Sequence, residues 1–457
     1  MSKTQIGWKA TSKDGVIAAG GAKAVAAGMQ ILEADGNAAD AAVATLLALM
    51  VTDHGECSIG GEVPLIIYDA KQQEVKVLSG QGGAPLSPDA IDWYMKNGIP
   101  EEGNIKIAPV PSVVDLCITT LQKYGTKTFA ELVAPTLDLL DAGDENWHPN
   151  LAKTLRRMVT EEQIAPGSRE ERLQAACDRF YGRNPERNDI AEELEAFYIE
   201  KGGFLRKADL AAHKTHIEEP VTINYRGYTI CKCGPWTQGP YLLQTLRLLE
   251  DYDFKGMGHL SPDYVHVAME AVKLAMADRD TYYGDPNFVD VPLDVLLSDE
   301  YTHIRRPLIN TEKASLEVRP GDPYKMLPIY KGGLYRPGVG GTTTCVVADR
   351  WGNVVAATPS ANILENGPEG GEAGITFGNR LRSLNTTPGH PNCIAPGKRP
   401  RITLTPTLVL KDDKPILAIS VAGGDLQDQV TLQLLLNFVE FGFLPEKAVI
   451  SPRFATT

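Results

Sequence analysis

An uninterrupted apolar run between Ala41 and Val51 restricts the fold of this chain more than any other feature. The run consists of alanine, leucine, valine and methionine with a single threonine, and it contains no charged residue. It is about half as long as the ~20 residues that a membrane-spanning helix needs. We therefore interpret residues 38–51 as a helix that is packed on nearly all sides inside a large hydrophobic core.

The segments around this helix predict alternating helices and strands. Apolar spacing predicts a helix over residues 22–34, which Gly36-Asn37 ends. The further expected elements are strands at 63–68, 74–78 and 225–231, polar helices between 115 and 220, helices at 238–251 and 261–281, a hairpin of 342–348 and 353–358, strands at 402–410 and 416–421, and a helix at 425–441 that Gly442 caps. Strands followed by helices, in both the first and the last part of the chain, indicate a layered α/β architecture.

Charge and cysteine content restrict the partners and the compartment. The net charge of −13, from 45 basic and 58 acidic residues, argues against nucleic-acid and anionic-membrane partners, because both need a positive field. Seven scattered cysteines form no disulfide framework and favour a reducing compartment. The first 18 residues lack the apolar centre of a secretion signal. We expect a cytoplasmic protein that acts on a small molecule.

Familiar motifs for nucleotides, metals and serine hydrolysis are missing. The glycine clusters have neither P-loop nor dinucleotide-binding spacing, and no G-x-S-x-G occurs. Cys231 and Cys233 are not followed by a second ligand pair at zinc spacing, and the eight histidines contain no H-E-x-x-H. We expect neither a cofactor nor a metal.

The segment Gly340-Gly341-Thr342-Thr343-Thr344 lies where a linker rich in proline and glycine meets a predicted strand. A threonine hydroxyl is a poor nucleophile unless a base takes its proton, and an N-terminal threonine supplies that base from its own α-amine. An α-amine titrates near 8, so enough of it is free base at neutral pH. Creating such a terminus needs attack on the preceding carbonyl, which a glycine permits at little steric cost. By itself the segment favours a glycine turn before a threonine-rich strand, because such turns are commonplace.

Ordered matches along the chain favour the first interpretation. They are Gly36 to Val43, Ser58-Ile59-Gly60-Gly61, Tyr225-Arg226-Gly227-Tyr228, Gly258-His259, Ala277-Asp278-Arg279-Asp280, Tyr283-Gly284-Asp285-Pro286, Thr342-Thr343, Asp349, Gly352-Asn353, Lys398-Arg399-Pro400, Thr405-Pro406-Thr407 and Ala422-Gly423-Gly424. With these residues the chain resembles, over nearly its whole length, the γ-glutamyltranspeptidase (glutathione hydrolase) family of N-terminal-nucleophile hydrolases.

The resemblance implies a four-layer αββα sandwich and self-cleavage into two fragments, 1–341 and 342–457. The fragments would form a heterodimer, with a dimer of these heterodimers as a further expectation. The family also continues beyond the position where this chain stops. The resemblance places the catalytic nucleophile at Thr342, two polar contacts of the nucleophile at Ser360 and Asn362, and the oxyanion hole at Gly423 and Gly424. Two backbone N–H groups at a strand-to-helix turn suit a developing negative charge.

Departures from the family's pattern indicate an altered substrate pocket. Gln81 stands where the family has the arginine that binds an α-carboxylate. The acidic residue that binds the α-ammonium is expected near 382–383, where this chain has Arg380, Arg382 and Ser383, and a serine pair is replaced by Ile402 and Thr403 beside Arg401. Because a guanidinium suits a carboxylate, we predict hydrolysis of a small amide that bears a carboxylate, such as oxamate, with Gln81, Arg380, Arg382 and Thr403 lining the pocket.

Two alternatives remain at this point. The chain could be a γ-glutamyltransferase or glutathione hydrolase like the family it resembles, or an inactive member that serves as a binding protein. Arg380, Arg382 and Arg401 could equally be surface arginines. Self-cleavage, or its absence, on a denaturing gel separates the enzyme from the inactive member.

Overall fold

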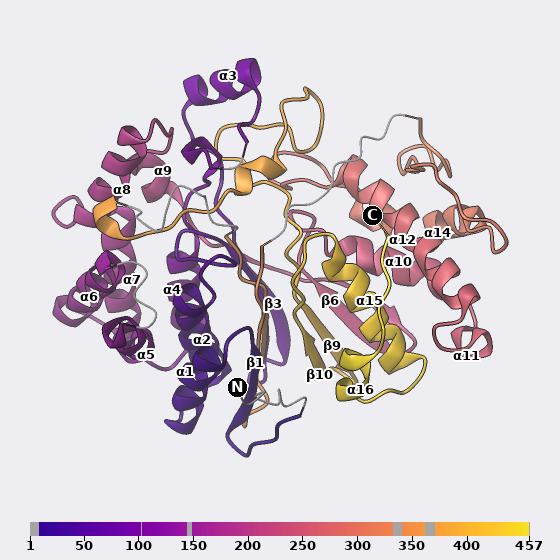
Figure 1. The fold of residues 1–457 in the computed structure, drawn as a ribbon, viewed down its shortest axis with the longest axis horizontal. Coiled ribbons are helices and arrows are strands. Elements are labelled where there is room, and N and C mark those ends of the chain that lie inside the picture. The colour runs from indigo at the N-terminus through magenta and orange to yellow at the C-terminus, as the bar shows by residue number, and fades with distance from the viewer. Residues whose placement is uncertain (1–8, 102, 144–148, 332–340, 362–370, 457) are drawn as a thin grey trace, which may run out of the picture.

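The computed structural model describes residues 9–101, 103–143, 149–331, 341–361 and 371–456, and it has four layers (Figure 1). From left to right in Figure 1, a group of helices, a first sheet, a second sheet and a second group of helices follow one another. The predicted αββα sandwich is confirmed.

Both sheets are antiparallel, and both mix residues from before and after Thr342. The first is ordered β1-β7-β8-β2-β3-β4, with β1 (Gly15–Ala19), β2 (Val63–Asp69), β3 (Glu74–Gly80), β4 (Ile217–Glu218), β7 (Cys345–Asp349) and β8 (Val354–Ala357). The second is ordered β10-β9-β6-β5, with β5 (Val221–Tyr225), β6 (Tyr228–Lys232), β9 (Thr407–Lys411) and β10 (Lys414–Ile419). Strands β7 and β8 thus lie between β1 and β2, and β9 lies between β10 and β6.

Most of the helices lie on the outer sides of the two sheets, whereas α3 (Pro88–Asn97) lies apart from both sheets at the top of Figure 1. Those before β4 are α1 (Ala22–Glu33), α2 (Ala38–Thr52), α3 (Pro88–Asn97), α4 (Val113–Tyr124), α5 (Phe129–Ala142), α6 (Pro149–Ile164), α7 (Arg169–Tyr181), α8 (Asp189–Glu200) and α9 (Lys207–Ala212). Those after β6 are α10 (Pro240–Leu249), α11 (Phe254–Met257), α12 (Pro262–Tyr282), α13 (Leu293–Leu296), α14 (Asp299–Arg305), α15 (Leu426–Val439) and α16 (Pro445–Ile450). None of the helices in the described ranges combines the length and the apolarity that crossing a bilayer requires.

Helix α2 is the buried helix that the apolar run predicts. Residues 38–51 are all buried, and α2 packs against α1, α4 and α5 and against strands β7 and β8. Asn37 begins this helix through a capping box, in which its side chain accepts from the N–H of Asp40 and the Asp40 carboxylate accepts from the N–H of Asn37. The left-handed residue after α1 is Asp35, with φ of 61°, so the expected stop at Gly36-Asn37 was one to two residues too late.

Two other predicted elements differ from the structure. The strand expected at 225–231 is a hairpin, because Arg226 and Gly227 have φ values of 54° and 82° and turn the chain between β5 and β6. The strand expected at 402–410 begins only at Thr407. Residues 402–406 are buried without joining a strand, and the carbonyl of Thr405 accepts a hydrogen bond from the buried ammonium of Lys232.

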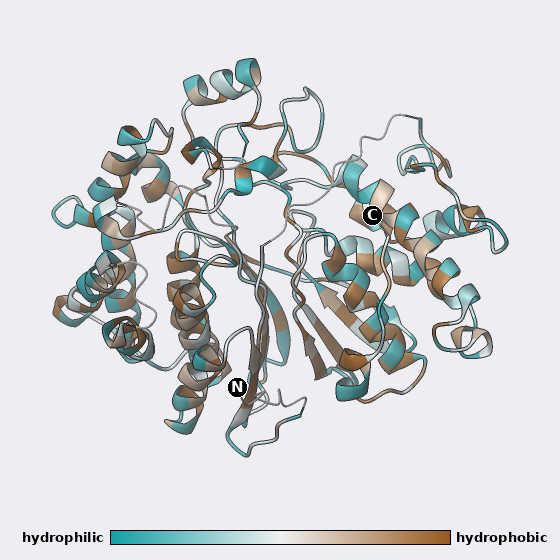
Figure 2. Cartoon of the chain, viewed as in Figure 1, coloured by the Kyte–Doolittle hydropathy of each residue, from teal (hydrophilic) through white to brown (hydrophobic). Residues whose placement is uncertain are grey.

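Apolar side chains fill the space between the two sheets. Figure 2 shows brown residues gathered on the strands, while teal residues are frequent on the outer helices. Ile66, Val77 and Ala356 of the first sheet and Cys231 and Leu408 of the second belong to one buried cluster. At one end of the sandwich, the hydroxyls of Thr358 and Ser420 lie 3.0 Å apart, which joins the segment after β8 to the segment after β10.

Candidate active site

Thr342 lies just before β7, and its peptide bond to Gly341 has polar groups at both ends. The side chain is buried, and its Oγ1 donates a hydrogen bond of 2.6 Å to the Gly341 carbonyl oxygen. The backbone N–H of Thr342 donates to Glu56 Oε2 at 2.8 Å. Gly341 has φ of 93°, a conformation that other residues rarely adopt, which explains the glycine before the threonine.

A chain of hydrogen bonds connects the Gly341 carbonyl to a buried ion pair. Ser360 Oγ donates to the Gly341 oxygen and accepts from Arg380 Nη2 at 2.7 Å. Arg380 Nε in turn donates to Glu62 Oε1 at 2.6 Å, and the side chains of Arg380 and Glu62 are 1% and 0% exposed. Burial raises the pKa of the Glu62 carboxyl, and Arg380 opposes that shift. The guanidinium of Arg380 is therefore already paired with a carboxylate.

The Ser58-Ile59-Gly60-Gly61 turn brings these residues together. The backbones of Glu62 and Ser360 exchange two hydrogen bonds, of 2.9 and 3.0 Å. A Cβ atom at Gly61 would lie 2.1 Å from the Ser360 carbonyl oxygen, and one at Gly60 would lie 2.2 Å from that of Thr376. Only glycine permits this close approach, so the turn fixes the position of Ser360.

Asp53 and Glu56, just after α2, contact the start of the Thr342–Thr344 run. Thr343 Oγ1 donates to Asp53 Oδ2 at 2.5 Å, next to the contact between Glu56 and Thr342. The sequence prediction missed Asp53, Glu56 and Glu62. The local sequence signal for them is that Glu56 and Glu62 flank the Ser58-Ile59-Gly60-Gly61 turn on its two sides.

Gly423 and Gly424 lie at the predicted strand-to-helix turn, between β10 and α15. Their φ values of 118° and 58° are in the region that favours glycine, and their carbonyls accept from the N–H groups of Leu426 and Gln427. Within the described residues, neither glycine N–H donates to a backbone carbonyl or a side chain. Two such groups beside a helix N-terminus are suited to stabilise an anion.

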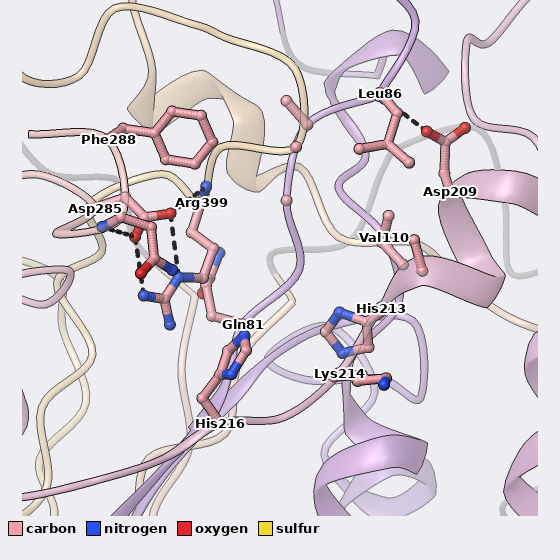
Figure 3. Close-up of a pocket in the computed structure, with 15 residues that line it drawn as sticks. Gln81, Leu86, Val110, Asp209, His213, Lys214, His216, Asp285, Phe288 and Arg399 are labelled. Atoms are coloured by element: carbon pink, nitrogen blue, oxygen red, sulfur yellow. Dashed lines mark hydrogen bonds and ion pairs between the residues drawn. The ribbon is translucent and has the colours of Figure 1, made fainter.

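Gln81 is buried beside a cavity of about 130 Å³ that His213, His216, Asp285 and Arg399 also line (Figure 3). Its Nε2 donates to the Gly82 carbonyl at 3.3 Å, and its Oε1 has no hydrogen-bond partner in the described structure. Asp285 and Arg399 are paired at 2.9 Å. Burial lowers the pKa of His213 to about 4, although Asp115 opposes this shift.

The remaining predicted pocket residues are buried or half-buried, and the surface interpretation is wrong for Arg380 and Arg401. Arg382 is half-buried on the same 3-10 turn, Arg380–Ser383, as Arg380. Thr403 is buried. Arg401 is 9% exposed, its Nη2 lies 3.5 Å from Asp280 Oδ1, and burial together with Arg279 lowers its pKa. Asn362 lies outside the described residues.

The structure thus joins some of the predicted residues directly and leaves others apart. Thr342, Ser360 and Arg380 form one hydrogen-bonded network around Gly341. Gln81 instead donates to the carbonyl of its neighbour Gly82, and Thr403 is buried. The described residues also contain no group of three His, Cys, Asp or Glu side chains placed to hold a metal ion.

Comparisons with known proteins agree on one family. The profile described as Gamma-glutamyltranspeptidase matches residues 24–145 and 139–457. The glutathione hydrolase proenzyme of Bacillus subtilis subsp. natto is 30% identical over 484 residues, covering 97% of this chain and 81% of that protein. The solved structure of LmbA2991HD is 34% identical, with a TM-score of 0.84 over 96% of this chain and 84% of that one. Cephalosporin acylase from Bacillus halodurans has a TM-score of 0.77 at 26% identity and covers 100% of this chain and 87% of that one.

Proposed function

The chain belongs to the γ-glutamyltranspeptidase family and is a self-processing amidohydrolase, and from this premise we propose that Thr342 is its nucleophile. The observation behind the proposal is the position of the Thr342 hydroxyl, 2.6 Å from the carbonyl oxygen of the glycine that precedes it. Cleavage at this bond would release the α-amine that a threonine nucleophile needs.

In the mature enzyme, the α-amine of Thr342 would take the proton from Oγ as the oxygen attacks the substrate amide. The N–H groups of Gly423 and Gly424 would hold the negative oxygen of the tetrahedral intermediate. The protonated amine would then transfer its proton to the leaving nitrogen, and water would release the acid from the acyl-enzyme.

The fragments 1–341 and 342–457 would stay together after cleavage as a heterodimer. Strands β7 and β8 of the smaller fragment lie between β1 and β2 of the larger one, and β9 of the smaller fragment pairs with β6 of the larger one. Separation of the fragments would therefore break both sheets. We further propose that two of these heterodimers form a dimer. We also propose a cytoplasmic location, for which the free state of the seven cysteines is the support.

We propose that the substrate is a small amide that bears a carboxylate, of the oxamate type. Binding a γ-glutamyl group needs an anion for its α-ammonium, and Arg382 and Ser383 stand where that anion is expected. An unpaired ammonium buried beside guanidinium groups would cost several kcal/mol, on the order reported for broken buried ion pairs. Arg380 is buried and paired with Glu62, whereas Arg382 is half-buried, and we assign the substrate carboxylate to Arg382 on the ground of this exposure.

The test compares kcat/KM for oxamate, glutathione and a chromogenic γ-glutamyl anilide on the cleaved enzyme. We expect oxamate to be preferred by tenfold or more, since a charge-assisted contact contributes roughly 1.5–3 kcal/mol. Arg382→Met should weaken the acidic amide selectively. Equal weakening of all three substrates would contradict the assignment of Arg382.

Hydrolysis or transfer of γ-glutamyl groups is the second candidate, and the names of relatives such as the Bacillus glutathione hydrolase favour it. A clear preference for the γ-glutamyl compounds would establish it.

A further inference from the structure

The peptide bond between Gly341 and Thr342 lies between a guanidinium on its oxygen side and a carboxylate on its nitrogen side. We propose that the Arg380–Glu62 pair and Glu56 serve the self-cleavage of this bond rather than the binding of substrate. This inference rests on the proposed role of Thr342. It assigns Glu56 as a catalytic residue of cleavage and Arg380 as a positioning residue that acts through Ser360.

The oxygen side is prepared for a negative charge. When Thr342 Oγ adds to the Gly341 carbon, the electron pair of the C=O bond moves onto the Gly341 oxygen. Ser360 Oγ already donates to that oxygen. Because Ser360 Oγ also accepts a hydrogen bond of 2.7 Å from Arg380 Nη2, its own proton is directed toward the Gly341 carbonyl. A donor polarised by a buried cation stabilises an oxyanion more than a free hydroxyl does.

The nitrogen side is prepared for a positive charge. The addition replaces the amide nitrogen by an amine nitrogen, which takes up the proton that the hydroxyl has lost before the C–N bond breaks. Glu56 Oε2 lies 2.8 Å from this nitrogen and stabilises its positive charge until the C–N bond breaks and the neutral amine leaves. The product is an ester between Gly341 and Thr342 Oγ, which water hydrolyses to the Gly341 carboxylate, the free hydroxyl and the α-amine.

Burial explains why Arg380 is better suited to this step than to substrate binding. The side chains of Arg380 and Glu62 are almost fully enclosed, and Arg380 Nε and Nη2 both contact Glu62. A substrate carboxylate would have to compete with a carboxylate that is already in place, and it would bring a second negative charge to Glu62. Ser360 needs no such displacement, because it contacts Arg380 and Gly341 at once.

The experiment follows cleavage of the full chain after a pulse of cell-free synthesis, by denaturing gel and N-terminal sequencing. Arg380→Met and the double variant Arg380→Met/Glu62→Met should both slow cleavage by tenfold or more, with Arg380→Lys between them and the wild type. The double variant removes the pair without leaving a buried charge alone, so it keeps the fold. Glu56→Gln, which keeps the shape of the side chain and loses its charge, should also be slowed by tenfold or more.

Hydroxylamine, which attacks esters, separates slow formation of the ester from slow hydrolysis of the ester. It should not restore cleavage in Arg380→Met or Glu56→Gln, because both changes slow formation of the ester. Arg157→Met is the matched control, since it breaks the partly buried pair of Arg157 and Glu193 in the outer helices and should cleave at the wild-type rate. Wild-type rates in the double variant and in Glu56→Gln would overturn this inference while Thr342 keeps its role. Cleavage of Thr342→Ala at the same bond would instead overturn the proposed function.

Discussion

The carboxylate of Asp349 accepts a hydrogen bond of 2.8 Å from the backbone N–H of Ala38, and it thereby connects the β7–β8 turn to the first residue of α2. The two residues are 311 positions apart and lie on opposite sides of the proposed cleavage point. Asp349 also accepts from the N–H of Trp351 and from Asn353 Nδ2, so one buried carboxylate fixes both the turn and the helix.

The first prediction is that Asp349→Ala lowers the free energy of unfolding by about 2 kcal/mol, the sum expected for a lost helix cap and the broken turn contacts. Urea unfolding measures this change. Asp349→Asn keeps the acceptor without the charge and should fall between the wild type and the alanine variant. A change of less than about 0.5 kcal/mol in Asp349→Ala would contradict the capping role.

The second prediction concerns the nucleophile. The purified chain should split between Gly341 and Thr342 without added protease, whereas Thr342→Ala should stay whole. Thr342→Ser keeps a hydroxyl and should cleave more slowly. N-terminal sequencing of the smaller band should read Thr-Thr-Thr-Cys, and any other start would move the nucleophile away from Thr342.

Much of this fold could be predicted because its signals are local. The apolar run of α2 and the polar turn between β7 and β8 are properties of short segments. The turn at Arg226 was missed because a non-glycine residue with φ of 54° has no strong sequence signal and the apolar residues on both sides looked like one strand.

The network around Thr342 could be predicted only in part, because its contacts are long-range. Arg380 and Glu62 are 318 positions apart, and Glu56 and Thr342 are 286 apart. The resemblance led to the prediction of Thr342 and Ser360 as site residues. It gave no indication that Glu62 pairs with Arg380, so the sequence analysis assigned the charge of Arg380 to a substrate.

The third prediction tests the oxyanion pair. Gly424 is buried and has φ of 58°, so Gly424→Ala adds strain and turns its N–H away from the site. We expect kcat to fall on the order of 10²-fold, as for the loss of an oxyanion donor, with a loss of stability of about 1–2 kcal/mol. Gly442→Ala, at an exposed left-handed glycine after α15, is the control for strain alone. Equal kcat in the two variants at saturating substrate would remove the catalytic role of Gly424.

The fourth prediction is a loss of stability in mild acid that depends on His213. Its pKa in the folded protein is about 4 because of burial, against about 6.5 when the chain is unfolded. As the pH falls from 6.5 to 4, the unfolded chain binds a proton that the folded protein does not, so this group destabilises the fold by up to about 3 kcal/mol across that window. The free energy of unfolding, measured in urea at pH 7.5 and at pH 5, should differ less between the two pH values for His213→Asn than for the wild type. His216→Asn, at an exposed histidine of the same cavity, should leave most of the difference in place, because burial and not His216 is the main cause of the lowered His213 pKa.

The last prediction uses Gln81 and Ser383 to change specificity. Gln81 is predicted to stand at the family's arginine position, and it borders a cavity of about 130 Å³, which gives a longer side chain room to fit. Ser383 stands where an acid for the α-ammonium is expected. The double variant Gln81→Arg/Ser383→Asp would supply both charges that a γ-glutamyl group needs, each contact contributing roughly 1.5–3 kcal/mol. The ratio of kcat/KM for a γ-glutamyl anilide to that for oxamate should therefore rise by tenfold or more, with a smaller rise in each single variant. An unchanged ratio in a double variant that still cleaves itself would show that neither position contacts the acyl group, and the substrate pocket would then have to lie elsewhere around Thr342.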